Sequence, residues 1–252
     1  MKLSSQNKRI LVLSDIHQEV DKANRIIKAE SADLIVNLGD EFDSFYKNSD
    51  YDVIKTCQFL TETLHDDKFH TLWGNHDLAY FYPSNHTLCS GYTTNKMSAI
   101  DKIFGPLKND LAKKFKWHIQ IDDFLCTHAG VSDNHLPPCL DLKNINEWLD
   151  EEAEAAKLRL NTDQSHWFYG AGKSRGGRLN KGGIVWLDFN NEFQPIKRLK
   201  QIFGHTYGKV IRGHRSDIFH NPNDWNNICI DCNLNQYLII SDGKIEVKNY
   251  TA

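Results

Sequence analysis

The segment RILVLSDIH, residues 9–17, decides the fold, because an apolar run ends abruptly there in an aspartate and a histidine. Such a run is typical of a buried strand that leads into a polar loop. The same pattern returns in DLIVNLGDEFD, residues 33–43, and in FHTLWGNHD, residues 69–77. Apolar residues recur at helical spacing between these runs. The sequence therefore predicts a β-α-β-α-β unit whose polar loops meet at one edge of a parallel sheet.

The second half of the chain predicts a second sheet. The spacing of apolar residues indicates helices at residues 97–115 and 145–160. Short strands are expected at residues 117–121, 124–127, 184–187, 201–203, 228–231, 236–240 and 244–248. No linker and no internal repeat divides the chain, so we expect a single domain over residues 1–252.

Composition excludes several classes of protein. A formal net charge of −3 and a pI of about 6.4 argue against a protein that grips a long nucleic-acid duplex, which needs many cationic contacts to phosphate. No apolar run approaches the roughly 18–20 residues that a bilayer span requires, and the first residues lack the apolar centre of a secretion signal. The six cysteines are scattered, which favours reduced thiols. We therefore expect a cytoplasmic protein with no membrane partner.

The polar residues at the ends of the apolar runs are of the types that bind divalent cations. They are Asp15, His17, Asp40, Asp43, Asn75, His76, His128 and His205. Carboxylate oxygen and imidazole nitrogen suit hard and borderline metal ions, and a carboxylate can bridge two ions about 3.5–4 Å apart. A single Asp or His at a strand end is usually an ordinary loop residue. Eight such residues, placed after five apolar runs in chain order, indicate a metal site.

The ordered set Asp-x-His, Gly-Asp-x-x-Asp, Gly-Asn-His-Asp, His-Ala-Gly and Gly-His-Thr resembles the calcineurin-like metallophosphoesterase superfamily, over residues 15–206. The Gly-His-Thr ending is similar to the branch of serine/threonine protein phosphatases and diadenosine tetraphosphate hydrolases, since the nuclease branch carries Gly-His-x-His. The resemblance implies an α/β fold, a four-layer α-β-β-α sandwich of two mixed β-sheets flanked by helices.

The resemblance also implies a centre of two divalent metal ions. Its ligands would be Asp15, His17, Asp40, Asn75, His128 and His205. Among them, Asp40 would bridge both ions. His76 would protonate the leaving oxygen, and Asp43 would hold that imidazole charged and oriented. Mn²⁺ is the expected ion, with Fe, Zn or Ni as alternatives. A hydroxide that bridges the two ions would attack the phosphate ester.

Two positions depart from the protein phosphatase pattern. Ser44 and Trp73 stand where members of that branch commonly carry arginines that would clamp a substrate phosphate. Their absence argues against a standard phosphoprotein substrate but not against hydrolysis. As the last residue of a strand, Trp73 is expected in the core rather than on a substrate.

A replacement for the missing arginines is the stretch at residues 170–183, where basic side chains alternate with glycines. Its Lys173, Arg175 and Arg178 are candidate substrate-binding residues, although an ordinary solvated loop has the same composition.

The predicted function is hydrolysis of phosphomonoesters, with a phosphorylated small molecule, a nucleotide or a phosphoprotein as substrate. One alternative is a phosphodiesterase or dinucleoside polyphosphate hydrolase with the same metal centre. An alternative of another class is a catalytically silent phosphate-binding module, whose sequence would be expected to have lost a ligand; none is lost here.

Overall fold

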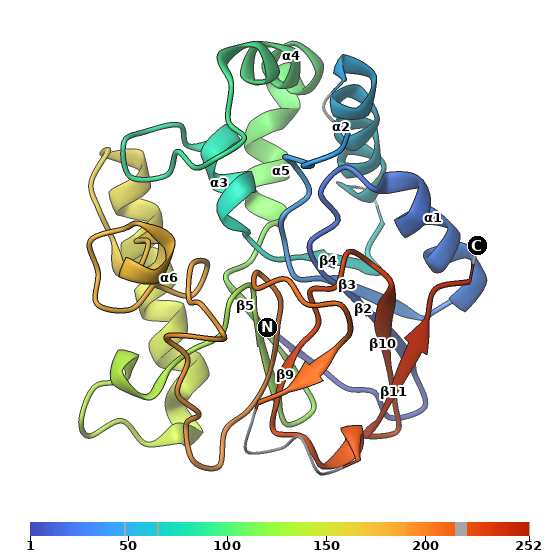
Figure 1. The fold of residues 1–252 in the computed structure, drawn as a ribbon, viewed down its shortest axis with the longest axis vertical. Coiled ribbons are helices and arrows are strands. Elements are labelled where there is room, and N and C mark those ends of the chain that lie inside the picture. Colours follow the sequence, from blue (N-terminus) through green and yellow to red (C-terminus); the bar gives the residue numbers. More distant parts are fainter. Residues whose placement is uncertain (48, 65, 215–220, 252) are drawn as a thin grey trace.

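The computed structural model describes residues 1–47, 49–64, 66–214 and 221–251. Two mixed β-sheets pack face to face, and helices cover their outer sides (Figure 1). Helices α1 (Val20–Glu30) and α2 (Asp50–Leu64) lie against one sheet, and α6 (Ile145–Asn161) lies against the other. The predicted α/β sandwich is therefore confirmed.

The five-stranded sheet contains the predicted β-α-β-α-β unit. Its order is β11-β10-β2-β3-β4, with β2 (Arg9–Leu13), β3 (Leu34–Asn37) and β4 (Phe69–Thr71) parallel. Strands β10 (Gln236–Ser241) and β11 (Lys244–Asn249) form an antiparallel hairpin that pairs with β2. The carboxyl ends of β2, β3 and β4 consequently lie along one edge of this sheet.

The six-stranded sheet has the order β1-β5-β6-β7-β9-β8. Its strands are β1 (Lys2–Leu3), β5 (His118–Ile121), β6 (Phe124–Thr127), β7 (Lys200–Phe203), β8 (Arg212–Gly213) and β9 (Asn227–Cys229). Strands β6 and β7 are parallel, so their carboxyl ends also point the same way. The loops after these strands carry His128 and His205.

Alternating side chains of β2 show how the layers are held together. Ile10 and Val12 are fully buried in the cluster between the two sheets, while Leu11 and Leu13 belong to the cluster that packs against the helices. A strand with both faces covered is apolar at every position. Burial on both faces explains why this run lacks the polar alternation of a surface strand.

The predicted helix at residues 97–115 is wrong as one continuous element. The structure has α4 (Thr94–Phe104), a 3-10 turn (Gly105–Leu107) and α5 (Lys108–Lys114). Pro106 has no backbone N–H to donate and disfavours helical geometry in the residue before it. Gly105 adopts φ +44° and ends α4 at this point.

The predicted strand at residues 184–187 is also wrong. Its apolar side chains are buried as expected, but the backbone forms a turn in which Trp186 N donates to Gly183 O at 2.9 Å. Ile184 O accepts from Ala129 N at 2.7 Å, so the segment bonds to loops instead of a strand. A short apolar run reports burial and does not specify extended backbone.

Trp73 lies in the core, as expected, with 4% of its surface exposed. Its ring stacks on Phe115 at a centroid distance of 4.2 Å. The six cysteines are free. Among the described residues, the helices are too short or too polar to cross a bilayer. The single domain and the cytoplasmic localisation stay predictions.

Candidate active site

The predicted site residues gather where the carboxyl ends of β2, β3, β4, β6 and β7 meet. A pocket of about 350 Å³ opens there, lined by six of the eight residues. These six are Asp15, His17, Asp40, Asn75, His76 and His205. The other two lie just beneath the pocket wall, since His128 contacts Asp40 and Asp43 contacts His76.

Left-handed backbone is concentrated in these loops. Positive φ angles occur at Asp15 (52°), His17 (42°), Asp40 (62°), Asp43 (63°) and His205 (65°). Residues with a Cβ adopt this region rarely, and such strain persists where the surrounding structure holds it for a purpose. The loops turn sharply so that several side chains converge on one point.

Two glycines allow the loops to approach the carboxylates. A Cβ on Gly74 would overlap the carboxylate and backbone of Asp40. A Cβ on Gly204 would overlap Asp15 Oδ2 and the hydroxyl of Ser14. The glycines of Gly-Asn-His and Gly-His-Thr are therefore required by close packing against the acidic side chains.

Asp40 is common to two groups of possible metal ligands. One group is Asp15, His17 and Asp40, and the other is Asp40, His128 and His205; in each, one ligand atom per residue lies within 4.8 Å of the others. Asp40 Oδ2 lies 3.8 Å from His17 Nε2 and 3.3 Å from His128 Nε2. This single carboxylate therefore stands between the two groups.

Backbone carbonyls orient two of the imidazoles. His17 Nδ1 lies 2.8 Å from Phe42 O, and His128 Nδ1 lies 2.8 Å from Leu38 O. A carbonyl oxygen can only accept a hydrogen bond, so each Nδ1 carries a hydrogen and donates. In a neutral ring the lone pair is then on Nε2, which faces the carboxylates. Metal-binding histidines are typically held by this kind of contact.

Among the predicted metal ligands, two buried polar atoms lack a hydrogen-bond partner within the described structure: Asn75 Nδ2 and His205 Nε2. Unpaired buried polar atoms are unfavourable and therefore uncommon in folded proteins. An imidazole nitrogen without a donor beside it suits a cation as its partner. The Asn75 side chain oxygen lies 3.2 Å from His128 Nε2, so both residues face the same point.

The electrostatics of the site follow from burial and close opposite charges. Burial raises the pKa of Asp40, but His128, His76 and His17 more than offset this, and the net pKa is lowered. Burial lowers the pKa of His128, yet Asp40 and Asp15 raise it to about 9. Burial and the neighbouring His128 lower the pKa of His205 well below its ordinary value. The carboxylates thus strongly favour positive charge between them.

His76 and Asp43 form the predicted pair. His76 Nδ1 lies 2.9 Å from Asp43 Oδ2. Burial lowers the pKa of His76, but Asp40 and Asp43 raise it well above its ordinary value. Tyr80 donates to Asp43 Oδ1 at 2.6 Å, and Lys96 lies 2.9 Å from the same oxygen. The contacts of Tyr80 and Lys96 with Asp43 were not predicted from the sequence.

The buried carboxylate of Asp77 connects two loops of the site. Asp77 accepts hydrogen bonds from the backbone N–H groups of Asp40 (2.8 Å), Glu41 (3.0 Å) and Gly74 (3.0 Å). Burial and the Asp77 charge raise the pKa of Glu41 well above its ordinary value. The loops that carry Asp40 and Asn75 are therefore fixed relative to each other by one carboxylate.

The basic stretch at residues 170–183 brings one cation to the pocket. Arg175 lines it, with Nε 2.9 Å from Asp188 Oδ2 and Nη2 donating to Thr206 Oγ1 at 3.1 Å. Lys173 and Arg178 are exposed and do not line the pocket. The contact of Asp188 with Arg175 is visible only in the fold.

Two pocket residues near the C-terminus were missed by sequence reasoning. Asp231 and Asn233 line the pocket, although they follow β9, far from the other loops in the chain. Burial and the Asp15 charge raise the pKa of Asp231 well above its ordinary value. The signal available was a polar Asp directly after an apolar run at residues 228–230, as at Asp15.

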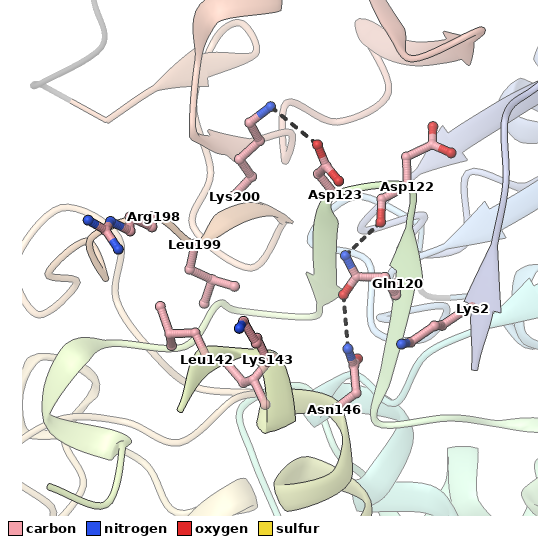
Figure 2. A pocket seen from close by; sticks show the side chains of 11 residues that line it. Lys2, Gln120, Asp122, Asp123, Leu142, Lys143, Asn146, Arg198, Leu199 and Lys200 are labelled. Atoms are coloured by element: carbon pink, nitrogen blue, oxygen red, sulfur yellow. Dashed lines mark hydrogen bonds and ion pairs between the residues drawn. The ribbon is translucent and has the colours of Figure 1, made fainter. Parts of the chain in front are cut away.

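A second pocket of about 350 Å³ lies at the β5–β6 turn and contains none of the predicted site residues. Figure 2 shows Gln120 paired with two neighbours in this pocket: Asn146 donates to Gln120 at 3.2 Å, and Gln120 donates to the backbone of Asp122 at 2.8 Å. Lys200 lies 3.8 Å from Asp123. The predicted metal-binding and catalytic residues therefore lie at the first pocket and not at this one.

Comparisons with solved structures agree with this fold. A cold-active protein-tyrosine phosphatase of a psychrophilic Shewanella species is 16% identical, with a TM-score of 0.60 over 98% of this chain and 80% of that one. A protein serine/threonine phosphatase from Saccharomyces cerevisiae is 12% identical, with a TM-score of 0.58 over 100% of this chain and 84% of that one. At these identities the likeness concerns the fold.

A putative diadenosine tetraphosphatase is 14% identical, with a TM-score of 0.50 over 99% of this chain and 98% of that one. No curated protein matches the sequence significantly. The family model for calcineurin-like phosphoesterases, however, matches residues 8–215, which include every predicted metal-binding and catalytic residue. The chain therefore belongs to the calcineurin-like phosphoesterase family and is a metal-dependent phosphoesterase, as the order of its loop residues predicts.

Proposed function

We propose that this protein is a dinuclear metal-dependent phosphatase that hydrolyses phosphomonoesters. The observation that carries the proposal is the position of Asp40 between two groups of possible ligands. Asp15 and His17 would hold the first ion, and Asp40 would bridge. The second ion would be held by Asn75, His128 and His205.

The donor set suits this assignment. It contains carboxylate oxygens, an amide oxygen and imidazole nitrogens, and no thiolate, which favours ions such as Mn²⁺ with Fe, Zn or Ni as alternatives. Two divalent ions, when bound, would lower the pKa of a coordinated water and neutralise charge that develops on the phosphoryl oxygens. Asn75 Nδ2 would then be free to donate to a substrate oxygen.

His76 would supply the proton for the leaving group. Asp43 accepts from Nδ1, and Asp40 and Asp43 raise the pKa of His76 so that the ring is cationic; Nε2 then carries the proton that the leaving oxygen would receive as the P–O bond breaks. One water is consumed, and the products are inorganic phosphate and an alcohol or phenol. Tyr80 and Lys96 hold the Asp43 carboxylate from its other oxygen, which fixes the imidazole in place.

Arg175 would bind the phosphate. Asp188 and Thr206 fix its guanidinium at the edge of the pocket, and an arginine held in this way presents its remaining N–H donors to an anion without further ordering. The substrate would be a phosphorylated small molecule, nucleotide or phosphoprotein. Lys173 and Arg178 have no role in this proposal because they do not line the pocket.

The test compares three substrates: para-nitrophenyl phosphate, bis-para-nitrophenyl phosphate and diadenosine tetraphosphate. Metal-stripped protein is refilled with Mn²⁺, beside an Asp40→Asn variant and a matched Asp101→Asn variant, whose carboxylate pairs with Lys108 on the surface. We expect fast monoester cleavage that Asp40→Asn abolishes and Asp101→Asn preserves. Preference for the diester or the dinucleotide would assign the alternative activity. No turnover with both ions bound would refute the enzymatic function.

A further inference from the structure

We infer that the ester group of the substrate is a planar aromatic ring, so that aryl phosphomonoesters are preferred over alkyl ones. This inference rests on the proposed function and adds a substrate class to it. It comes from the side chains at the mouth of the pocket, which play no part in the proposed metal binding or proton transfer.

Most of the exposed aromatic side chains of the described residues lie at this mouth. Within the described residues, four aromatic side chains are exposed: Phe45 (79%), Tyr46 (88%), Tyr51 (66%) and Tyr207 (61%). Three of the four line the pocket, and only Tyr51 does not. Isolated exposed apolar residues need no explanation, but a group of them around a functional cavity marks a binding surface.

The loop that carries Phe45 and Tyr46 is anchored. The Ser44 hydroxyl accepts hydrogen bonds from Tyr46 N at 3.1 Å and from Lys47 N at 2.9 Å, and Ser44 N donates to Gln18 Oε1 at 2.9 Å. Ser44 stands where the protein phosphatase pattern has an arginine. Here the position therefore serves to hold two aromatic side chains beside the site.

The loop of Tyr207 is anchored in a similar way. Arg212 Nη2 donates to Thr206 O at 2.5 Å and to Tyr207 O at 3.3 Å. Rigid loops bind with a smaller loss of conformational entropy than mobile ones. The aromatic groups are consequently presented to a ligand in a preorganised arrangement.

Aromatic rings also lie directly against the proposed ligands. The Phe45 ring centroid is 6.3 Å from that of His17, and the Trp186 ring centroid is 5.4 Å from that of His205. Aromatic surface therefore lies beside one proposed ligand of each metal ion. A planar ring attached to the phosphate gains stacking contacts that an alkyl chain cannot make.

Charge and size argue for one phosphoryl group. Among the described residues that line this pocket, Arg175 is the single lysine or arginine. A polyphosphate chain needs several cations along its length, and these lining residues offer one arginine beside the proposed metal ions. The volume of about 350 Å³ is at the lower end of the roughly 300–1,000 Å³ that small-molecule pockets span. A small aryl phosphate meets these conditions.

The experiment compares O-phosphotyrosine with O-phosphoserine, which share an amino-acid backbone and differ by the ring. The kcat/KM of each is measured with the Mn²⁺-loaded protein and with Phe45→Ala, Tyr207→Ala and the matched control Tyr51→Ala. Because phenols leave more readily than alkanols, the quantity compared is the ratio of variant to unchanged protein for each substrate. Stacking contacts of this kind correspond to about 3- to 10-fold in kcat/KM.

We expect Phe45→Ala and Tyr207→Ala to lose about 3- to 10-fold toward O-phosphotyrosine, mainly in KM, and less than about 2-fold toward O-phosphoserine. Tyr51→Ala should leave the kcat/KM of both substrates unchanged. A phosphotyrosine peptide and phenyl phosphate then distinguish a protein substrate from a free small molecule, and faster cleavage of either supports the aryl class. Equal losses on both amino acids, or none, would overturn the inference while leaving the phosphatase intact. Absence of turnover on every ester would instead refute the proposed function.

Discussion

Asp43 is the carboxylate on which proton donation to the leaving group depends, because it holds His76 and is itself held by Tyr80 and Lys96. We predict that Asp43→Asn lowers kcat by about 10²–10⁴-fold, the usual contribution of acid catalysis, with metal content unchanged. The loss should be larger for phenyl phosphate than for para-nitrophenyl phosphate, since the poorer leaving group needs the proton more.

Tyr80→Phe provides the graded comparison for this prediction. It removes one hydrogen bond to a charged carboxylate, so its effect on kcat should be about 10-fold. Steady-state rates with both esters, beside metal analysis of each variant, check both changes. An Asp43→Asn variant that keeps its rate on phenyl phosphate would remove His76 from the proposed mechanism.

At the scale of elements, the site depends on how closely the loop after β7 approaches the loop after β2. Gly204→Ala would place a methyl group against Ser14 and the Asp15 carboxylate. We predict a loss of about 1–3 kcal/mol in the free energy of unfolding, as overpacking typically gives, and Mn²⁺ affinity lowered by at least about 10-fold. Thermal unfolding and calorimetric titration measure the two quantities.

Gly176→Ala is the matched control, since no atom lies within 4 Å of the added methyl group, beyond the neighbouring residues in the chain. Its φ of +76° makes an alanine unfavourable by about 1–2 kcal/mol, so stability should fall while Mn²⁺ affinity stays the same. If both variants bound Mn²⁺ as the unchanged protein does, the packing of Gly204 would have no part in the site.

Elements whose sequence combines an apolar run with a polar end were predictable. Residues 9–17, 33–43 and 69–77 carry their strand and their site residues within a few positions, so local pattern and chemistry agree. The backbone of residues 184–187 was not predictable in this way, because burial alone does not distinguish a strand from a turn. Pro106 encodes the helix break at Gly105. The apolar spacing on both sides of it nevertheless led to the prediction of one continuous helix.

Contacts between distant segments account for the remaining differences. Tyr80 and Lys96 reach Asp43 through the packing of α3 (Asn75–Phe81) and the first turn of α4, and Asp231 approaches Asp15 only because β9 joins the second sheet. Neither relation has a spacing that can be read along the chain. The sequence therefore predicted the groups at the loop ends and missed those that orient or surround them.

At the scale of the whole molecule, a buried histidine links stability to pH. His118 in β5 is 3% exposed, and burial lowers its pKa from 6.5 to about 4 despite the nearby Asp150. Between these values the unfolded chain binds a proton that the folded chain does not, so the free energy of unfolding falls as pH falls from 6.5 toward 4. The shift corresponds to a loss of up to about 3 kcal/mol.

Urea unfolding between pH 7 and pH 4.5 tests this link. The unchanged protein should lose stability more steeply than His118→Leu, which removes the titrating group and keeps an apolar side chain in the strand. Equal slopes for the two proteins would show that His118 is not the source of acid sensitivity. The variant also leaves every residue of the proposed metal site in place.

The central claim, a centre of two ions bridged by Asp40, is tested most directly by the metal content of the protein. Metal-stripped protein is loaded with Mn²⁺, freed of excess ion by dialysis, and analysed by mass spectrometry for Mn per chain. The account predicts two Mn²⁺ per chain for the unchanged protein and for Asp101→Asn, and fewer than one for Asp40→Asn. A single ion in the unchanged protein, or two in Asp40→Asn, would contradict it.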